Sequence, residues 1–140
     1  MTPIRRATSE DTPQLERLFQ LTRQHTFAMR PATDFQGGDY AKSTEGEDVW
    51  VAEKNGKIIG FVSTYPADNF IHNLFIHPDV HRTGLGTQLL HIAEATLARP
   101  MTLKIAMDNL KACSFYEKHG WVKISTHVDG DEPYMVYGKG

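Results

Sequence analysis

Cysteine is the residue type that this chain has least of, with one in 140 residues. A single cysteine, Cys113, excludes an internal disulfide and favours a reducing compartment. Neither sign of charge dominates, since 15 Lys and Arg face 17 Asp and Glu, and no basic excess points to nucleic acid. No apolar run approaches the roughly 20 residues that a membrane helix needs, and the N-terminal segment has no apolar signal core. We therefore expect a cytoplasmic protein with no nucleic-acid or membrane partner.

The chain also lacks internal repeats and low-complexity linkers. Its length of 140 residues is typical of one domain, and 40% of the residues are hydrophobic, which is enough for a core without disulfides or metals. We expect residues 1–140 to form a single domain.

In the first third of the chain the pattern predicts a short strand and then a helix. Residues 3–8 suit a strand, and residues 8–27 suit a helix with Ser9 or Asp11 as its cap. Residues 30–48 are the least regular part and suggest a loop with a short helix. The apolar face of the long helix recurs at helical spacing at Leu15, Leu18, Phe19 and Thr22.

From residue 49 onward the period changes. Two β-rich runs surround Asn55-Gly56, which is a strong hairpin signal. A third β-rich run ends at Pro78, and a helical stripe begins at Gly84. A strand, a helix capped by Asp108 or Asn109 and stopped by Gly120, and a final strand pair follow at residues 101–107, 108–120, 121–128 and 132–139. This order predicts a mixed α/β fold in which one strand–helix–strand crossover interrupts antiparallel strands.

The hexapeptide "HRTGLG" at residues 81–86 joins a strand to a helix. Gly84 and Gly86 lack Cβ, the first helical N–H groups have no partner, and the helix end carries partial positive charge. Together they favour an anion site, to which Arg82 adds a charge. The alternative is a plain strand-to-helix turn. A Walker loop is excluded because Thr87-Gln88 follows the second glycine, and a dinucleotide fingerprint is excluded because position 89 is leucine.

Two segments carry a resemblance to a known family. "HNLFIHPDVHRTGLGTQLL" resembles the acyl-CoA-binding motif of the GNAT superfamily of N-acetyltransferases, with Gly84 and Gly86 in place and His81 where the family usually has Gln or Arg. "NLKACSFYEKHGW" is similar to the family's later motif. The residues that match this second motif are Asn109, Ala112, Phe115, Tyr116, Gly120 and Trp121.

The resemblance implies a GNAT-like acyl-CoA N-acyltransferase fold. Its sheet is mixed and mostly antiparallel, with six or seven strands, about four flanking helices, and a splay between the fourth and fifth strands. In such a fold the main-chain N–H groups of residues 82–87 bind the pyrophosphate of acetyl-CoA, a strand edge pairs with the pantetheine, and Asn109 hydrogen-bonds it. The implied cosubstrate-binding residues are Leu74, Phe75, Ile76, His81, Arg82, Thr83, Gly84, Leu85, Gly86, Thr87, Asn109, Ala112 and Tyr116.

The implied reaction is direct transfer of the acetyl group from acetyl-CoA to a primary amine in a ternary complex. By its position in the family motif, Tyr116 sits by the thioester sulfur and protonates the leaving thiolate, while the alternative is a core tyrosine on an amphipathic helix. Cys113 is interpreted as a small packing residue. Lys104, Lys111 and Arg99 are interpreted as surface charges, with contact to the 3′-phosphate as an alternative.

A base, or a site that lowers the pKa of the amine, is also required, because an alkyl ammonium with a pKa near 10.4 cannot attack. His72 is the candidate, since imidazole titrates near neutrality and some family members use Glu or His on this strand. The alternatives are a satisfied, half-buried histidine and a carboxylate of "STEGED" (residues 43–48) as the base. Strand alternation assigns Phe70, His72, Leu74 and Ile76 to one face and Ile71, Asn73 and Phe75 to the other.

Four histidines fall within 20 residues, at positions 72, 77, 81 and 91, but their spacing matches no common zinc pattern, so no metal is expected. The preferred acceptor is an amine of a small molecule. A protein N-terminus or lysine is the alternative acceptor, and a non-catalytic acyl-CoA-binding module is the alternative function. The sequence leaves the oligomeric state open, and analogy with the family, which is often dimeric, favours a homodimer.

Overall fold

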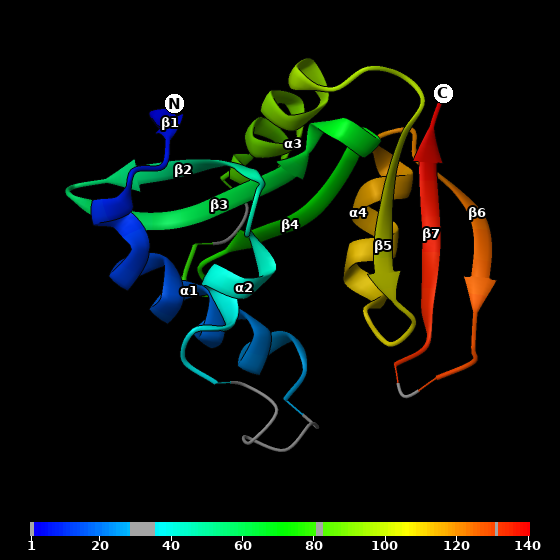
Figure 1. Ribbon diagram of the computed structural model, residues 1–140, viewed down its shortest axis with the longest axis horizontal. Helices are drawn as coiled ribbons and strands as arrows, with labels where there is room; N and C mark the ends of the chain where they lie inside the picture. Colours follow the sequence, from blue (N-terminus) through cyan, green and yellow to red (C-terminus); the bar gives the residue numbers. More distant parts are fainter. Residues whose placement is uncertain (1, 29–35, 81–82, 131) are drawn as a thin grey trace.

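A computed structural model describes residues 2–28, 36–80, 83–130 and 132–140 of the chain. The elements follow the order expected from the sequence (Figure 1). They are β1 (Ile4–Arg6), the short 3-10 helix η1 (Ser9–Asp11), α1 (Thr12–Thr26), α2 (Asp39–Ser43), β2 (Asp48–Lys54), β3 (Lys57–Tyr65), the 3-10 helix η3 (Pro66–Asp68), β4 (Phe70–Ile76), α3 (Leu85–Thr96), β5 (Met101–Ala106), α4 (Leu110–Lys118), β6 (Val122–His127) and β7 (Tyr134–Lys139).

The strands form one seven-stranded sheet in the order β1-β2-β3-β4-β5-β7-β6. Every neighbouring pair is antiparallel except β4 and β5, which run parallel. These two strands pair at only two positions, Phe70 with Thr102 and Ile71 with Leu103. Beyond them β4 and β5 diverge as a V, as Figure 1 shows. The mixed sheet and its splay are therefore confirmed.

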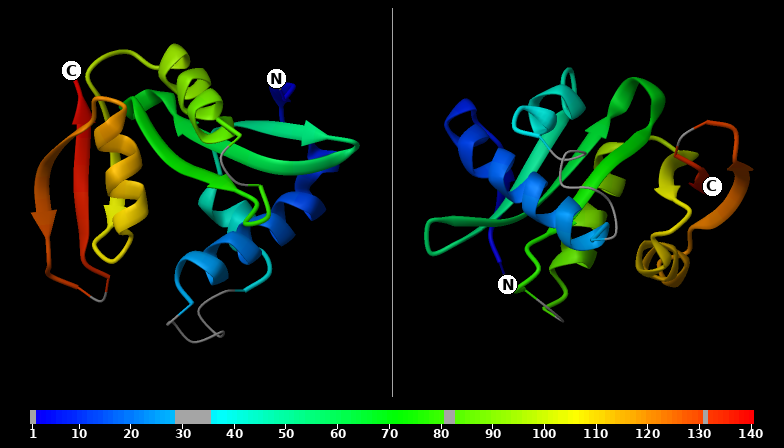
Figure 2. Two further views of the ribbon diagram at one scale, coloured as in Figure 1. Left: turned by 180° about the vertical axis from the view of Figure 1, so that it is seen from behind. Right: turned by 90° about the horizontal axis from the view of Figure 1, so that it is seen from below.

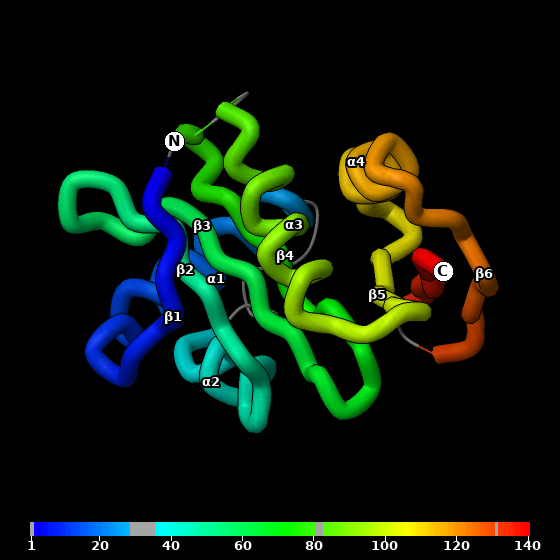
Figure 3. Tube along the Cα trace, turned by 90° about the horizontal axis from the view of Figure 1, so that it is seen from above, coloured from blue at the N-terminus to red at the C-terminus, as the bar shows by residue number. Residues whose placement is uncertain are grey.

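The helices cover the sheet in two pairs, α1 with α2 on one face and α3 with α4 on the other (Figures 2 and 3). The larger core packs α3 and α4 against strands from both halves of the sheet, including the fully buried Trp121. The smaller core joins α1 and α2 to β2, β3 and β4, and a cluster of aromatic rings connects the two helices to β3 and β4. Its rings belong to Phe19, Tyr40, Phe61 and Phe75.

Local turn chemistry explains several boundaries. Asn55 and Gly56 both have positive φ, at 53° and 78°, which is the backbone of the tight hairpin turn that the sequence predicted. Asn109 caps α4, because its Oδ1 accepts the N–H of Ala112 at 3.2 Å. Gly120 follows α4 with φ of 89°, as expected for a left-handed helix stop.

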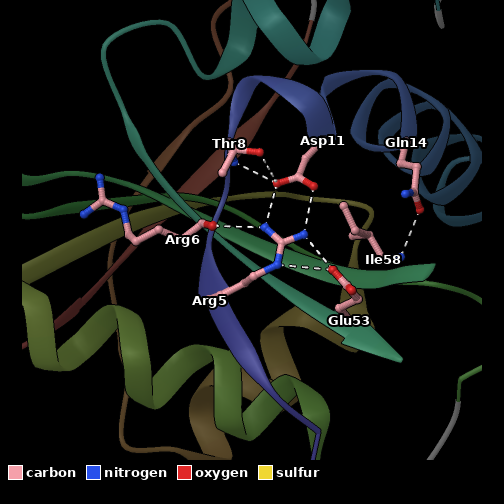
Figure 4. Close-up of polar contacts among 7 residues, drawn as sticks. All are labelled: Arg5, Arg6, Thr8, Asp11, Gln14, Glu53 and Ile58. Carbon is pink, nitrogen blue, oxygen red and sulfur yellow. Dashed lines mark hydrogen bonds and ion pairs between the residues drawn. The ribbon is translucent and has the colours of Figure 1, made fainter. Parts of the chain in front are cut away.

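An ion-pair network joins the first strand, the first helix and the hairpin (Figure 4). The Arg5 guanidinium donates to both Asp11 oxygens at 2.8 and 2.9 Å and to Glu53 at 2.6 Å. Asp11 also accepts the N–H of Thr8 at 2.7 Å, so it caps the short turn ahead of α1. The Arg5 hydrogen bonds lower the pKa of Asp11 from 3.8 to about 2.

The predicted alternation along β4 is wrong for Ile71 and His72, because each lies on the face opposite to the one assigned to it. The register of β3 with β4 shifts so that Ser63 pairs with Asn73 and Thr64 pairs with Ile71, leaving His72 as an extra residue. Such a bulge breaks the two-residue period. As a result Ile71 joins the larger core, on the same side as Leu74, while residues after the bulge alternate normally.

Candidate active site

A groove of about 540 Å³ runs along the α3 and α4 face of the splay. Most of its wall is apolar, and its floor includes the C-terminal half of β4. The residues that line it are Leu74, Ile76, Val80, Thr83, Gly84, Leu85, Gly86, Thr87, Lys111, Ala112, Phe115 and Tyr116. Nine of the thirteen residues expected to bind acetyl-CoA are in this set, so the structure brings most of them together.

The N-terminus of α3 forms one end of the groove. Gly84 holds the left-handed conformation, with φ of 76°, and its C=O accepts the first helical hydrogen bond from Gln88 at 3.1 Å. The N–H groups of Leu85, Gly86 and Thr87 therefore have no intrahelical partner. These donors and the helix dipole favour an anion at this end. Positions 81 and 82, also expected to bind acetyl-CoA, lie outside the described residues.

Gly84 and Gly86 are glycines for different structural reasons. Gly84 is required by its positive φ, and a Cβ there would meet nothing within 4 Å. A Cβ on Gly86 would lie 3.3 Å from Cε1 of Phe115. Gly86 thus lets the start of α3 approach the Phe115 ring of α4. Helix packing is therefore a structural reason for this glycine, and ligand access at Gly86 stays a prediction from the sequence.

Tyr116 enters the groove from α4. It is only 8% exposed, and its ring packs edge-on against Phe115 and Trp121 at centroid distances of 5.1 and 5.9 Å. Burial raises the pKa of the phenol well above its usual value of 10. The hydroxyl carries its proton at neutral pH, as a tyrosine does at its usual pKa, and the raised pKa makes it a weaker acid than an exposed tyrosine.

The free edge of β4 faces the opening of the V. Leu74, Phe75 and Ile76 pair with β3 on one side, whereas the pairing of β4 with β5 ends at Ile71. An extended ligand thus finds unpaired main-chain groups along this edge. The Phe75 side chain points away from the groove, into the aromatic cluster around Phe19, so its contribution to binding is restricted to the main chain.

Asn109 and Trp121, two further residues of the second motif, do not line the groove but stabilise the elements around it. Asn109 uses its Oδ1 to cap α4. Its Nδ2 is the group that would donate to pantetheine. Trp121 Nε1 donates to Glu94 at 3.0 Å, and Glu94 also accepts from Lys139, which ties α3 to β7. Cys113 lies in the larger core as a free thiol.

A second, more polar cavity of about 430 Å³ lies on the α1 and α2 face of β4. It is lined by Phe19, Arg23, Asp39, Lys42, Ser43, His72, Asn73 and Phe75. His72 and Asn73 are consecutive, and the bulge allows both to border the same space. Asn73 is fixed there, because its Nδ2 donates to Ser63 at 2.9 Å and to Ser43 at 3.1 Å.

His72 directly follows the last residue of β4 that pairs with β5, so it stands where the V begins. Its Nδ1 lies 2.7 Å from Oε2 of Glu47, and the side chains are 38% and 8% exposed, respectively. Glu47 belongs to the "STEGED" segment whose carboxylates the sequence offered as alternative bases. The structure brings the two candidates into contact.

Of the three cations named above as alternatives for the 3′-phosphate, one borders the groove. Lys111 is among its lining residues. Lys104 lies over the Tyr134 ring at 4.9 Å, and Arg99 donates to the C=O of Gly140 at 2.8 Å. Within the described part of the chain, no three or more His, Cys, Asp or Glu side chains are grouped so that they could hold a metal ion.

The chemistry of the groove suits coenzyme A. It has main-chain donors at the start of α3, apolar walls along the unpaired edge of β4, and the buried phenol of Tyr116 on α4. A family comparison agrees with this geometry, because the model of the acetyltransferase (GNAT) family matches residues 12–121. The chain belongs to the GNAT family. It is an acetyl-CoA-dependent N-acetyltransferase, and this enzymatic assignment replaces the alternative of a non-catalytic module.

Curated relatives of this GNAT enzyme include two bacterial proteins. The chain is 30% identical over 134 residues to the uncharacterized N-acetyltransferase YhfO of Bacillus subtilis, covering 84% of this chain and 88% of the relative. It is 32% identical over 72 residues to the peptidyl-lysine N-acetyltransferase YiaC of Escherichia coli, covering 51% of this chain and 48% of the relative.

Solved GNAT structures share the fold. The PaiA N-acetyltransferase of Thermoplasma acidophilum, in complex with coenzyme A, superposes with a TM-score of 0.80 at 20% identity, over 97% of this chain and 98% of that one. The ribosomal-protein-S18-alanine N-acetyltransferase of Escherichia coli has a TM-score of 0.72 at 22% identity, over 99% and 92%. At such identities the likeness shows the fold alone. None of the helices in the described ranges has the length and apolar character to cross a membrane.

Proposed function

We propose that this enzyme transfers the acetyl group of acetyl-CoA directly to the primary amine of a small molecule, within a ternary complex. The observation that carries the proposal is that two hollows border opposite faces of β4. Leu74 and Ile76 line the apolar groove, and His72, Asn73 and Phe75 line the polar cavity. The apolar groove takes the cosubstrate, and the polar cavity beside His72 takes the amine. Its volume of about 430 Å³ is within the range of small-molecule sites.

In this proposal, the groups at the fork of the V move the protons. At neutral pH the acceptor is an ammonium ion, so one proton passes to His72 before attack. The amine nitrogen then bonds to the acetyl carbon and the carbon–sulfur bond breaks. Tyr116 gives its proton to the departing thiolate. The attacking nitrogen loses a second proton, which returns through solvent to the phenol, so one proton is released for each acetyl group.

Binding of acetyl-CoA is assigned in the same proposal to the groove. The N–H groups at the start of α3 hold the pyrophosphate, and the main chain of Leu74, Phe75 and Ile76 pairs with the pantetheine. Among the described residues that line the groove, Lys111 is the cation. The support for this assignment is the match between donor positions and the chemistry of the ligand.

A protein acceptor is the second candidate, and one observation favours it. The relative YiaC is described as a peptidyl-lysine N-acetyltransferase. The cavity of this chain borders solvent and also carries cations, Arg23 and Lys42, beside one carboxylate, Asp39. A lysine side chain presented by a peptide would enter the same cavity as a free amine.

An acetylation assay with an amine panel separates these acceptors. Thiol release from acetyl-CoA is measured with small alkyl amines, polyamines and amino acids, and in parallel with peptides that carry lysine or a free N-terminus. We expect the highest kcat/KM for a small amine. A peptide that exceeds every small amine by tenfold or more would transfer the proposal to protein substrates.

The setting of the reaction is also part of the proposal. We assign residues 1–140 to one acetyltransferase domain. We also assign the enzyme to the cytoplasm, because its single cysteine, Cys113, is a buried free thiol, as is typical of a reducing compartment.

A further inference from the structure

The contact between Glu47 and His72 gives the proposed histidine base a carboxylate partner. Glu47 reaches His72 from the turn that follows α2, where Gly46 has φ of 75° and the N–H of Glu47 bonds to the C=O of Thr44 at 2.9 Å. The carboxylate is 8% exposed, whereas the imidazole borders the acceptor cavity. The two residues are 25 positions apart, so the contact is made by the fold.

The carboxylate of Glu47 is incompletely satisfied. Its Oε2 contacts His72, while Oε1 is buried and has no hydrogen-bond partner among the described residues. A buried carboxylate with one partner is costly unless that partner brings a compensating charge. The imidazolium form of His72 supplies this charge, since a hydrogen bond between opposite charges is the stronger kind.

The contact also decides which ring nitrogen can act. An ionised carboxylate only accepts hydrogen bonds, so Nδ1 of His72 must carry the hydrogen that points at Glu47. In the neutral ring Nε2 then holds the lone pair. An orienting carboxylate plays this part for the histidine of hydrolase triads.

We propose that Glu47 is a positioning residue for the acetyl transfer: it holds His72 in the tautomer whose Nε2 takes the proton of the amine, and it stabilises the imidazolium that results. The proposal rests on the role given to His72 above. In this proposal Glu47 acts through His72 and contacts neither substrate. Other charges border the same cavity, namely Arg23, Asp39 and Lys42, and the buried Tyr40 lies near Glu47.

The first test needs no acceptor. Imidazole ¹⁵N chemical shifts of the full chain are recorded by NMR at a pH where His72 is neutral. We expect the Nδ1–H tautomer for His72, and in Glu47→Ala we expect the Nε2–H form that predominates for a histidine side chain in water. Finding Nε2–H in the unmodified chain, or no change in Glu47→Ala, would overturn the proposal.

The second test is kinetic and uses the amine with the highest kcat/KM in the panel, or the best peptide if no small amine reacts. We expect Glu47→Gln to lower kcat by about 10- to 100-fold, and less than His72→Ala does, because the imidazole itself remains. The KM for acetyl-CoA should stay unchanged. Equal kcat in Glu47→Gln and the unmodified chain would contradict a positioning role.

Thr64→Val is the matched control. Thr64 pairs with Ile71 beside the bulge, and its buried Oγ1 also lacks a partner among the described residues. Replacing this hydroxyl removes a buried polar atom from the same region without touching the carboxylate–imidazole contact. We expect the tautomer of His72 and kcat to stay as they are. A loss of kcat equal to that of Glu47→Gln would show that general repacking explains both.

Discussion

The two hollows on either side of β4 are built in contrasting ways. The groove on the α3 and α4 face depends on the backbone: a left-handed glycine, three N–H groups without a helical partner and an unpaired strand edge. The cavity on the α1 and α2 face depends on side chains that converge from three separate segments. A backbone turn needs particular residues, such as glycine, at fixed positions along a short stretch of sequence. Side chains that converge from distant segments have no fixed spacing in the sequence. The first hollow therefore matches a family motif, and the second matches none.

The sharpest test of this contrast is at Tyr116, the groove residue that is proposed to protonate the leaving thiolate. We expect Tyr116→Phe to lower kcat by about 10², at the lower end of acid–base effects, because a thiolate is already a fair leaving group. The dissociation constant of acetyl-CoA, measured by calorimetry, should change less than twofold. Trp121, which packs against the Tyr116 ring, remains in place in this variant. Unaltered turnover would remove Tyr116 from the mechanism.

A substitution at the start of α3 tests whether the groove holds an anion. Gly86→Glu and Gly86→Lys add similar bulk against Phe115 but opposite charge. We expect the Glu variant to bind acetyl-CoA at least about tenfold more weakly than the Lys variant, a difference of about 1.4 kcal/mol. Calorimetric titration of both variants measures it. Equal affinities would mean that no phosphate lies near this turn.

One lysine borders each hollow, which offers a matched pair. Lys111→Ala removes a cation from the groove, and Lys42→Ala removes one from the cavity. Because exposed ion pairs are weak, we expect changes of only about two- to fivefold. Steady-state kinetics should show the KM for acetyl-CoA rising in the first variant and the KM for the amine changing in the second. The opposite pattern would reverse our assignment of the two hollows.

The smallest effect on activity is expected far from both hollows. Asp11→Asn weakens the contact with Arg5, and because Arg5 is 43% exposed we expect a loss of only ~1 kcal/mol in the free energy of unfolding at pH 7. The pKa of Asp11 is about 2 in the folded state and 3.8 ordinarily, so its contribution is complete above pH 4 and is lost as the pH falls towards 2.

Urea unfolding at pH 7 and at pH 2.5 measures this difference between Asp11→Asn and the unmodified chain. We expect the gap to narrow at the lower pH, while kcat at pH 7 stays unchanged in both. A gap that is the same at the two pH values would mean that the carboxylate of Asp11 contributes through packing and not through its charge.

The sequence predicted the element order, the hairpin at Asn55-Gly56 and the cap at Asn109, because these depend on neighbouring residues. The sites assigned to the motif residues remain predictions, although most of them border one groove. The bulge at His72 was not predicted, since it depends on how β3 pairs with β4. The choice of Glu47 among the carboxylates of its segment also needed the fold, because only tertiary structure brings it to His72.

The brief parallel contact between β4 and β5 has a consequence beyond catalysis. The sheet is continuous through only two residue pairs at this seam, so its halves share few main-chain hydrogen bonds. A cosubstrate lying in the V adds contacts to both halves at once. Acetyl-CoA would then be a temporary strand of the sheet as well as an acetyl donor. By mass action, the free energy of unfolding would rise as the fraction of enzyme bound to acetyl-CoA rises.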